Sequence, residues 1–216
     1  MKRKIRFIDC GANIGQSIDW ARKVFLNDDL KIDSFEPLPK NIEVLKKRYE
    51  SGAVFEDEEI KILIPCEKGY SVYHSLVIHE GAVSNQEGTA TFYCQDWGAR
   101  TGSSLVKGKT STTGGDTVEV KTFNLKKWID ENVGEDEIPV LKVDIEGAEY
   151  DLLPHLIKGE VHKKIDYWLV EFHGDKVPNC DVKVEELLRD NVKYLFDWDL
   201  DMDVVENQLR EIGFLE

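Results

Sequence analysis

The stretch IRFIDCGANIGQSIDWA, residues 5–21, joins a short apolar run to a segment with helical spacing. Gly11 and Gly15 stand between the two parts. We expect a buried strand over 4–9 and a helix over 14–26, because apolar residues recur in the second segment at every third or fourth position. A strand followed by a glycine-containing turn and a helix is typical of an α/β fold.

Segments of these two kinds alternate along the rest of the chain. Further strands are expected at 31–35, 60–64, 75–79, 139–144 and 167–172, and further helices at 38–49, 125–131, 148–157 and 204–212. Strands at 89–94 and 117–122 would form an antiparallel arm around 89–123, joined by a Gly/Ser/Thr/Lys-rich stretch, 98–116, that predicts a long mobile loop. This order predicts one domain over 1–216, with a mostly parallel sheet covered by helices on both faces.

The composition limits the classes of partner. The chain has 216 residues, 28 of them basic and 42 acidic, which gives a formal charge of −14. Such a surface repels phosphate backbones and anionic lipids, so neither nucleic acid nor a membrane is expected as the main partner. The four cysteines, Cys10, Cys66, Cys94 and Cys180, form no CxxC pair. We therefore expect no disulfide framework or zinc cluster, and a reducing, cytoplasmic compartment.

Charged side chains stand where four of the predicted strands end. They are Asp9, Glu36, Asp144, and Glu171 with His173. Ligands of open parallel sheets bind outside these carboxyl ends. Gly11 allows close approach of a ligand, but the glycine spacing departs from GxGxxG and the Asp9 carboxylate disfavours a pyrophosphate. A cationic or hydroxyl-bearing ligand suits the loop better.

Glu36 is the clearest candidate for binding a sugar ring. A carboxylate at the end of the second strand can accept hydrogen bonds from both hydroxyls of a ribose. By itself Glu36 would be interpreted as a solvated loop acid. Together with the loop at 9–15, it favours the ribose role.

The stretch LKVDIEGAEYDLL, residues 141–153, carries the densest set of charges. Lys142 should face the same side of its strand as Asp144, and a lysine inside a central strand needs an acidic partner. The acids at 146 and 149 are expected to complement the dipole of the following helix. His173 beside Glu171 is a candidate general base.

Together these residues resemble the FkbM family of class I S-adenosylmethionine-dependent methyltransferases. The resemblance rests on FIDCGANIGQS, FEPLPKN, GAVSNQEGTATFY, GSSL, VEVKTFNLKKWI and above all LKVDIEGAEYDLL, which follow the family's order over residues 5–175. It implies a Rossmann-like fold and O-methylation of a hydroxyl on a sugar, a glycan or a related metabolite.

The resemblance also implies which residues contact the cofactor, S-adenosylmethionine. Those expected at its methionine part are Asp9, Gly11, Asn13 and Gly15. Those expected at its ribose and adenine are Glu36, Ala82 and Ser84. Asp144 would stand beside the sulfonium methyl. An acidic loop and a strand-two carboxylate also suit a sulfonium and a ribose diol better than they suit NAD.

The acceptor side is less clearly defined. GSSL matches the family, so Ser103, Ser104 and Lys107 are expected in a lid that closes on the substrate, with Lys107 or Lys109 meeting a phosphate or nucleotide carrier. A base must take the acceptor's proton, and the candidates are, in order, His173, Glu171 and Asp144. Asp144 and Glu171 could also bind Mg²⁺, but hydrogen bonding of the substrate by the same residues is preferred.

The C-terminal part departs from the class I pattern, which has two further edge strands. The stretch 194–200 could be a displaced strand; otherwise the sheet edge after 167–172 is bare. Bare edges invite pairing with another chain. We therefore expect either a homodimer that covers this edge or a module of a longer enzyme with attached glycosyltransferase domains.

Three alternatives remain open. A NAD(P)-dependent oxidoreductase shares the architecture, although Asp9 and the missing GxGxxG argue against it. A non-catalytic scaffold would not need acids at four strand ends. Within methyltransferases, a protein, lipid or amine acceptor is compatible with these motifs.

Overall fold

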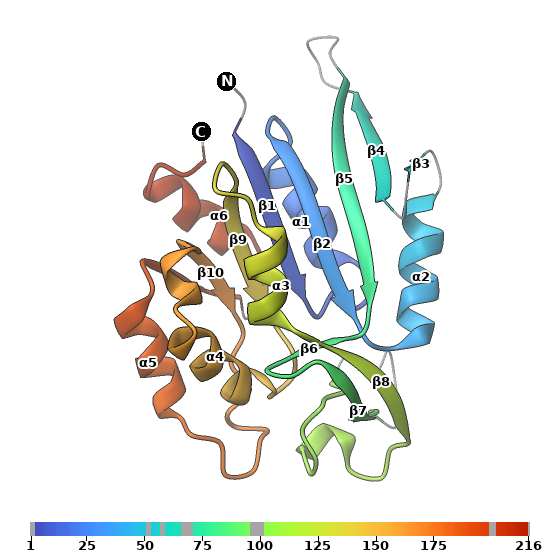
Figure 1. The fold of residues 1–216 in the computed structure, drawn as a ribbon, viewed down its shortest axis with the longest axis vertical. Helices are drawn as coiled ribbons and strands as arrows, with labels where there is room; N and C mark the ends of the chain where they lie inside the picture. The colour runs from blue at the N-terminus through green and yellow to red at the C-terminus, as the bar shows by residue number, and fades with distance from the viewer. Residues whose placement is uncertain are drawn as a thin grey trace.

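The computed structural model describes residues 3–50, 53–56, 59–65, 71–95, 102–198 and 202–215. The strands of its central sheet are β1 (Lys4–Cys10), β2 (Asp29–Glu36), β3 (Ala53–Glu56), β4 (Glu59–Pro65), β5 (Ser71–Glu80), β9 (Ile138–Val143), β10 (Tyr167–Val170) and β11 (Tyr194–Asp197). The helices are α1 (Gln16–Val24), α2 (Pro39–Glu50), α3 (Leu125–Asn132), α4 (Glu149–Lys158), α5 (Lys183–Asn191) and α6 (Met202–Glu211). The strand order is β11-β10-β9-β1-β2-β5-β4-β3 (Figure 1).

The strands from β11 to β5 run parallel, β4 pairs antiparallel with β5, and β3 pairs antiparallel with β4. β1 lies in the middle, where Phe7 stands opposite Ile32 of β2 and Val140 of β9. The expectation of a mostly parallel α/β sheet is confirmed. Because β1, β2, β9 and β10 point the same way, their carboxyl ends meet at one edge of the sheet.

Two apolar cores cover the two faces of this sheet. Neighbouring residues of β1 point to opposite sides, so Phe7 packs with the helices α1, α2 and α6, whereas Ile8 packs with α3, α4 and α5. Both side chains are fully buried. The segment 4–9 is apolar only at Ile5, Phe7 and Ile8, and the buried Arg6 between them is paired with Asp33 of β2.

A small second sheet forms the predicted arm. It consists of β6 (Ala82–Ser84), β8 (Thr117–Asn124) and β7 (Gly88–Tyr93), in that order. β7 and β8 are antiparallel, as expected for an arm around 89–123, whereas the short β6 pairs with β8 in parallel. The arm lies below the carboxyl ends of β1 and β2 in the view of Figure 1.

The segment between the arm strands differs from the expected mobile loop. Residues 98–101 lie outside the described residues, as does Cys66. Residues 102–116 pack against the domain: Ser104 forms a bridge with Tyr93, and the side chain of Lys109 is fully buried. A short 3-10 helix, η1 (Thr110–Thr112), follows. The high content of glycine, serine and threonine therefore reflects a compact turn-rich segment.

The C-terminal part decides between the two alternatives expected for the sheet edge after 167–172, because the displaced strand expected within 194–200 is present as β11 (Tyr194–Asp197). The edge beyond β10 is not bare, because β11 pairs with it in parallel and Trp198 N–H donates to the Val170 carbonyl at 3.1 Å. Residues 199 and 200 of the predicted displaced strand lie outside the described residues. The connection to β11 contains α5, a helix that was not predicted although Val184 and Leu188 are buried four positions apart. The bare-edge argument for a homodimer therefore does not apply to β10, and the homodimer stays a prediction.

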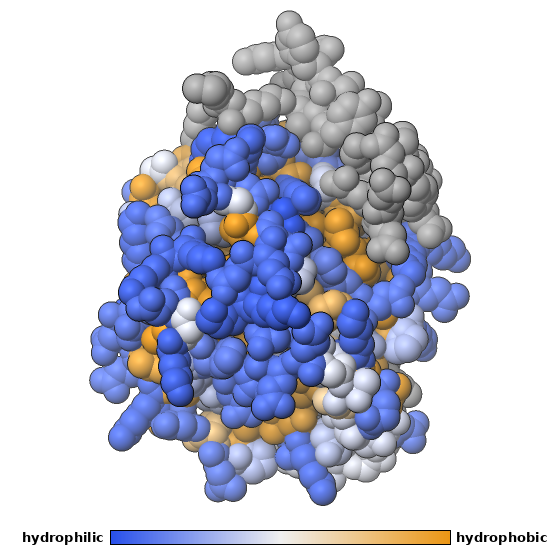
Figure 2. All heavy atoms as spheres, viewed as in Figure 1, coloured by the Kyte–Doolittle hydropathy of each residue, from blue (hydrophilic) through white to orange (hydrophobic). Residues whose placement is uncertain are grey.

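Hydrophilic residues predominate on the face of the molecule shown in Figure 2, in keeping with a net charge of −14. None of the helices in the described ranges has both the length and the apolar character required to span a bilayer.

Candidate functional site

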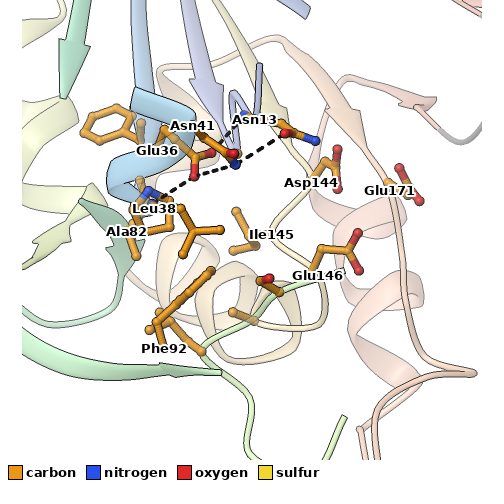
Figure 3. A pocket seen from close by; sticks show the side chains of 17 residues that line it. Asn13, Glu36, Leu38, Asn41, Ala82, Phe92, Asp144, Ile145, Glu146 and Glu171 are labelled. Atoms are coloured by element: carbon orange, nitrogen blue, oxygen red, sulfur yellow. Dashed lines mark hydrogen bonds between the residues drawn. The ribbon is translucent and has the colours of Figure 1, made fainter. Parts of the chain in front are cut away.

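A cavity of about 260 Å³ opens at the carboxyl ends of β1, β2, β9 and β10. Loop residues after these strands supply most of its wall, and the arm closes one side (Figure 3). Its polar lining residues include Asn13, Glu36, Asn41, Asp144, Glu146 and Glu171. The position agrees with the rule for parallel sheets, and the volume approaches the range of small-molecule sites.

Close packing around the loop after β1 requires glycine at positions 11 and 15. Gly11 has φ +94°, and a Cβ there would lie 1.9 Å from the carbonyl oxygen of Asp144. Gly15 has φ +100°, and a Cβ there would lie 2.5 Å from the Tyr49 hydroxyl. Gly11 and Asn13 line the cavity, whereas Gly15 lies beneath the loop and only starts α1. Gly15 thus packs against Tyr49 and does not line the cavity in which a cofactor contact was expected.

Asp9 does not line the cavity, which corrects its expected contact with the ligand. Its carboxylate is fully buried and accepts hydrogen bonds from the hydroxyls of Ser17 at 2.7 Å and Ser34 at 3.1 Å. Its other oxygen lies 3.3 Å from Lys142 Nζ. Asp9 therefore neutralises a buried lysine below the site.

Glu36 stands at the cavity wall with both oxygens partly engaged. Oε1 accepts from Leu38 N–H at 2.9 Å and from Asn41 Nδ2 at 3.2 Å, and Oε2 accepts from Asn13 N–H at 2.9 Å. Burial raises the pKa of the Glu36 carboxyl to about 7, although these hydrogen bonds oppose the shift. The carboxylate is held rigidly and keeps acceptor capacity for a ligand hydroxyl.

An apolar slot lies beside Glu36. Its lining residues are Leu38, Ala82, Val83, Phe92, Leu105 and Ile145. Ala82 is where the sequence placed it, but Ser84 and Lys107 line a neighbouring cavity of about 330 Å³. Phe92 and Leu105 were not expected at the site. Alternation in β7 could indicate an inward face at Phe92, but only the fold reveals what that face meets.

Three carboxylates stand at the other side of the cavity, those of Asp144, Glu146 and Glu171 (Figure 3). Lys142 lies behind them and is buried, with Nζ 3.3 Å from Asp144 Oδ2 and 2.8 Å from the Gly11 carbonyl. The predicted pairing of Lys142 with an acid is confirmed. Burial opposes a charged Lys142, but Asp144 and Asp9 outweigh it and raise the pKa of the ammonium group.

His173 is fully buried behind the same carboxylates. Nδ1 lies 3.0 Å from Glu149 Oε1, and Nε2 lies 3.0 Å from Glu171 Oε1 and 3.5 Å from Glu146 Oε2. Burial lowers the pKa of the imidazole, but the neighbouring glutamates outweigh it and raise the pKa to about 10. Such an imidazole keeps its proton at neutral pH, which argues against its first rank as general base.

Glu149 binds backbone groups of two segments, in addition to its expected interaction with the helix dipole. Its side chain is fully buried, and its two oxygens accept from the backbone N–H groups of Gly147 at 2.7 Å and His173 at 2.9 Å. It fixes the imidazole as well as the turn before α4. The sequence signal, an acid in a first helical turn, is the same for both roles.

The segment after β7 contributes unequally to the site. Ser103 lines the cavity, and its hydroxyl accepts from Gln95 N–H at 2.9 Å. Ser104 is fully buried and binds Val106 N–H, so it makes no substrate contact. Lys109 is paired with Glu146, and its Nζ donates to the Gly102 carbonyl at 3.3 Å. The ammonium group of Lys109 is thus buried and paired in the described structure, which disfavours its expected contact with a carrier phosphate.

Comparison with known proteins gives one extensive match. Residues 9–197 match the family model described as Methyltransferase FkbM domain. Among solved structures, the methyltransferase FkbM from Methylobacillus flagellatus is similar at 15% identity with a TM-score of 0.42; the match covers 76% of this chain and 32% of that chain. The chain thus spans about a third of that protein's length. None of the curated proteins matches this chain.

Proposed function

The chain belongs to the FkbM methyltransferase family, and from this premise we propose that it transfers a methyl group from S-adenosylmethionine to a hydroxyl of a sugar, a glycan or a related metabolite. The observation that carries the proposal is the division of one cavity between Glu36, with its apolar slot, and the carboxylates of Asp144 and Glu171. Methyl transfer does not require a nicotinamide cofactor. We therefore do not retain the alternative of a NAD(P)-dependent oxidoreductase.

The donor set suits the cofactor part by part. The slot formed by Phe92, Leu105 and Ala82 suits a flat adenine, and Glu36 beside it can accept from the ribose hydroxyls. Gly11 and Asn13 leave the methionine part room on the side of β9. When bound, S-adenosylmethionine supplies a methyl group on a positively charged sulfur. The nearby carboxylates would stabilise this charge.

The residues around Asp144 would orient the acceptor and take its proton. Asp144 and Glu171 are exposed to the cavity, with side chains that retain about a quarter of their exposure. Either carboxylate can accept the hydroxyl proton through a hydrogen bond, and aligning the acceptor oxygen supplies much of the rate enhancement. His173 positions Glu171 from behind. We therefore place Glu171 and Asp144 before His173 as bases.

Calorimetry with S-adenosylmethionine tests the cofactor assignment. Replacing a hydrogen-bond acceptor of the ribose, Glu36→Gln, is expected to weaken binding roughly 10- to 100-fold. Glu80→Gln is the matched control, because Glu80 ends the neighbouring strand β5 with its exposed side chain paired to Lys46. Absence of binding to the folded wild-type chain would refute the proposal, and equal binding by the two variants would refute the role of Glu36.

A methylation assay against a panel of acceptors tests the reaction. We expect product from hydroxyl-bearing sugars, with a large loss of kcat in Glu171→Gln or Asp144→Asn. Transfer only to amines or to protein side chains would contradict the proposed acceptor class while leaving the cofactor assignment intact.

A further inference from the structure

The acidic side of the cavity has the composition of a cation site. Asp144, Glu146 and His173 each offer one ligand atom, and these three atoms lie within 4.8 Å of one another. Glu171 Oε1 adjoins them at 3.0 Å from His173 Nε2. Ligands of Mg²⁺ lie about 2.1 Å from the ion, so opposite ligands are about 4.2 Å apart. Shifts of a few tenths of an ångström would therefore let one ion reach the ligand atoms of Asp144, Glu146 and His173.

A second observation points to a ligand at this place. His173 Nε2 is buried and has no hydrogen-bond partner among the described residues, although carboxylate oxygens surround it. The opposite nitrogen, Nδ1, lies 3.0 Å from Glu149 Oε1. A carboxylate on one imidazole nitrogen, with the other nitrogen aimed at oxygen ligands, is the usual support of a metal-binding histidine.

The charges around His173 are also unbalanced. Asp9, Asp144, Glu146, Glu149 and Glu171 form one contact network with Lys109, Lys142 and His173. The carboxylates outnumber the two lysines by three, and a proton on His173 removes only one of these charges. Buried or half-buried carboxylates in excess are costly unless a cation joins them.

We propose that Asp144, Glu146, Glu171 and His173 bind one divalent cation at the acceptor side of the cavity. Oxygen ligands with a single imidazole favour Mg²⁺ or Mn²⁺ over metals that prefer sulfur. The ion replaces the proton on Nε2 and shares Glu146 with Lys109. If the proposed function holds, the ion's remaining positions face the acceptor and can take its hydroxyl oxygens, and Glu171, bound to the ion through one oxygen, keeps the other oxygen for the acceptor's proton. Binding of the ion itself does not depend on that function.

Titration with Mn²⁺, followed by electron paramagnetic resonance without cofactor or acceptor, tests the site on the whole chain. We expect one bound ion per chain, displacement by excess Mg²⁺, and a nitrogen coupling from the His173 imidazole. Glu146→Gln and Glu171→Gln should each weaken binding at least tenfold. Their side chains are partly exposed, which favours folding, and thermal unfolding confirms that each variant is folded.

Glu87→Gln serves as the control, because this exposed carboxylate pairs only with Lys127 on the surface in the described structure. No Mn²⁺ bound at millimolar concentration would overturn the proposal, and so would equal binding by the three variants. Absence of the nitrogen coupling would remove His173 from the site. Because the readout needs no methyl transfer, a failure here is distinguishable from a failure of the proposed function.

Discussion

Lys142 joins two parts of the site that are far apart in sequence. Its ammonium group lies between Asp9 and Asp144 and donates to the carbonyl of Gly11, 131 positions away. Lys142 and Asp9 are both buried, so each needs the other to offset the loss of water. The loop after β1 and the end of β9 are thereby held in register.

Removing this charge should be costly. Lys142→Met leaves the Asp9 carboxylate buried without its cation and is expected to lower the free energy of unfolding by about 3 to 5 kcal/mol. Denaturant unfolding measures the change. In the double variant Asp9→Asn, Lys142→Met, the loss should be smaller than the sum of the single losses. Additive losses would show that the pair is not coupled.

Glu36 should make stability depend on pH. Its pKa rises from 4.5 to about 7 on folding, so the folded chain binds this proton more tightly than the unfolded chain. Ionising Glu36 therefore penalises the folded state, fully above about pH 7 and not at all well below pH 4.5. Relative to wild type, Glu36→Gln should gain up to about 3 kcal/mol of unfolding free energy between about pH 4 and pH 8. A constant difference across this range would contradict the shift.

The contacts of a single residue could be predicted from the sequence where its partner lies on the same strand. Lys142 and Asp144 share a strand face, so their pairing follows from alternation alone. The burial of Asp9 and the pKa of His173 depend on neighbours from other strands and loops. Such neighbours become known only with the strand order. For this reason Asp9 was expected to contact the ligand, and His173 was expected to act as the base.

At the scale of elements, the segment 102–112 is fastened by one buried ion pair. Lys109 contacts Glu146, and its side chain is fully buried. Replacing it by methionine keeps the apolar stem and removes the charge. Hydrogen exchange of the amides in 102–112 should then accelerate at least roughly tenfold, with β1 and β2 unchanged.

Lys107→Met is the matched control for this experiment. Lys107 is exposed two positions before Lys109 and contributes only to the neighbouring cavity. Its replacement should leave exchange in 102–112 as in wild type. The same exchange pattern in both variants would mean that Lys109 does not fasten the segment.

At the scale of elements, most strands and helices with a clear apolar pattern were predicted from the sequence, and two very short strands were not. The buried runs of β1, β2 and β9 and the helices α1 and α2 have clear periodicity, and their order gave the parallel sheet. β3 and β6 have only four and three residues, which is too short for a period to be recognised. The arm was recognisable because β7 and β8 alternate over six and eight residues.

At the scale of the whole molecule, the net charge of the chain and the charge of the cavity lining are both negative. The chain has a formal charge of −14, and none of the described residues that line the main cavity is basic. A cleft lined by one sign of charge concentrates ligands of the opposite sign. The same negative potential repels an acceptor that carries phosphate. The expected contact of Lys109 with a carrier phosphate would instead have favoured such an acceptor.

This field predicts how salt affects the cofactor and its product differently. S-adenosylmethionine carries one net positive charge at neutral pH, whereas S-adenosylhomocysteine carries none. Raising the salt from about 0.02 M to about 0.3 M shortens the screening length roughly fourfold, so the affinity for S-adenosylmethionine should fall several-fold while that for S-adenosylhomocysteine changes little. Calorimetry at the two concentrations measures both. Asp144→Asn should reduce the difference, because it removes one cavity carboxylate. Equal salt dependence for the two ligands would show that hydrogen bonding and packing, and not the charge of the molecule, determine cofactor affinity.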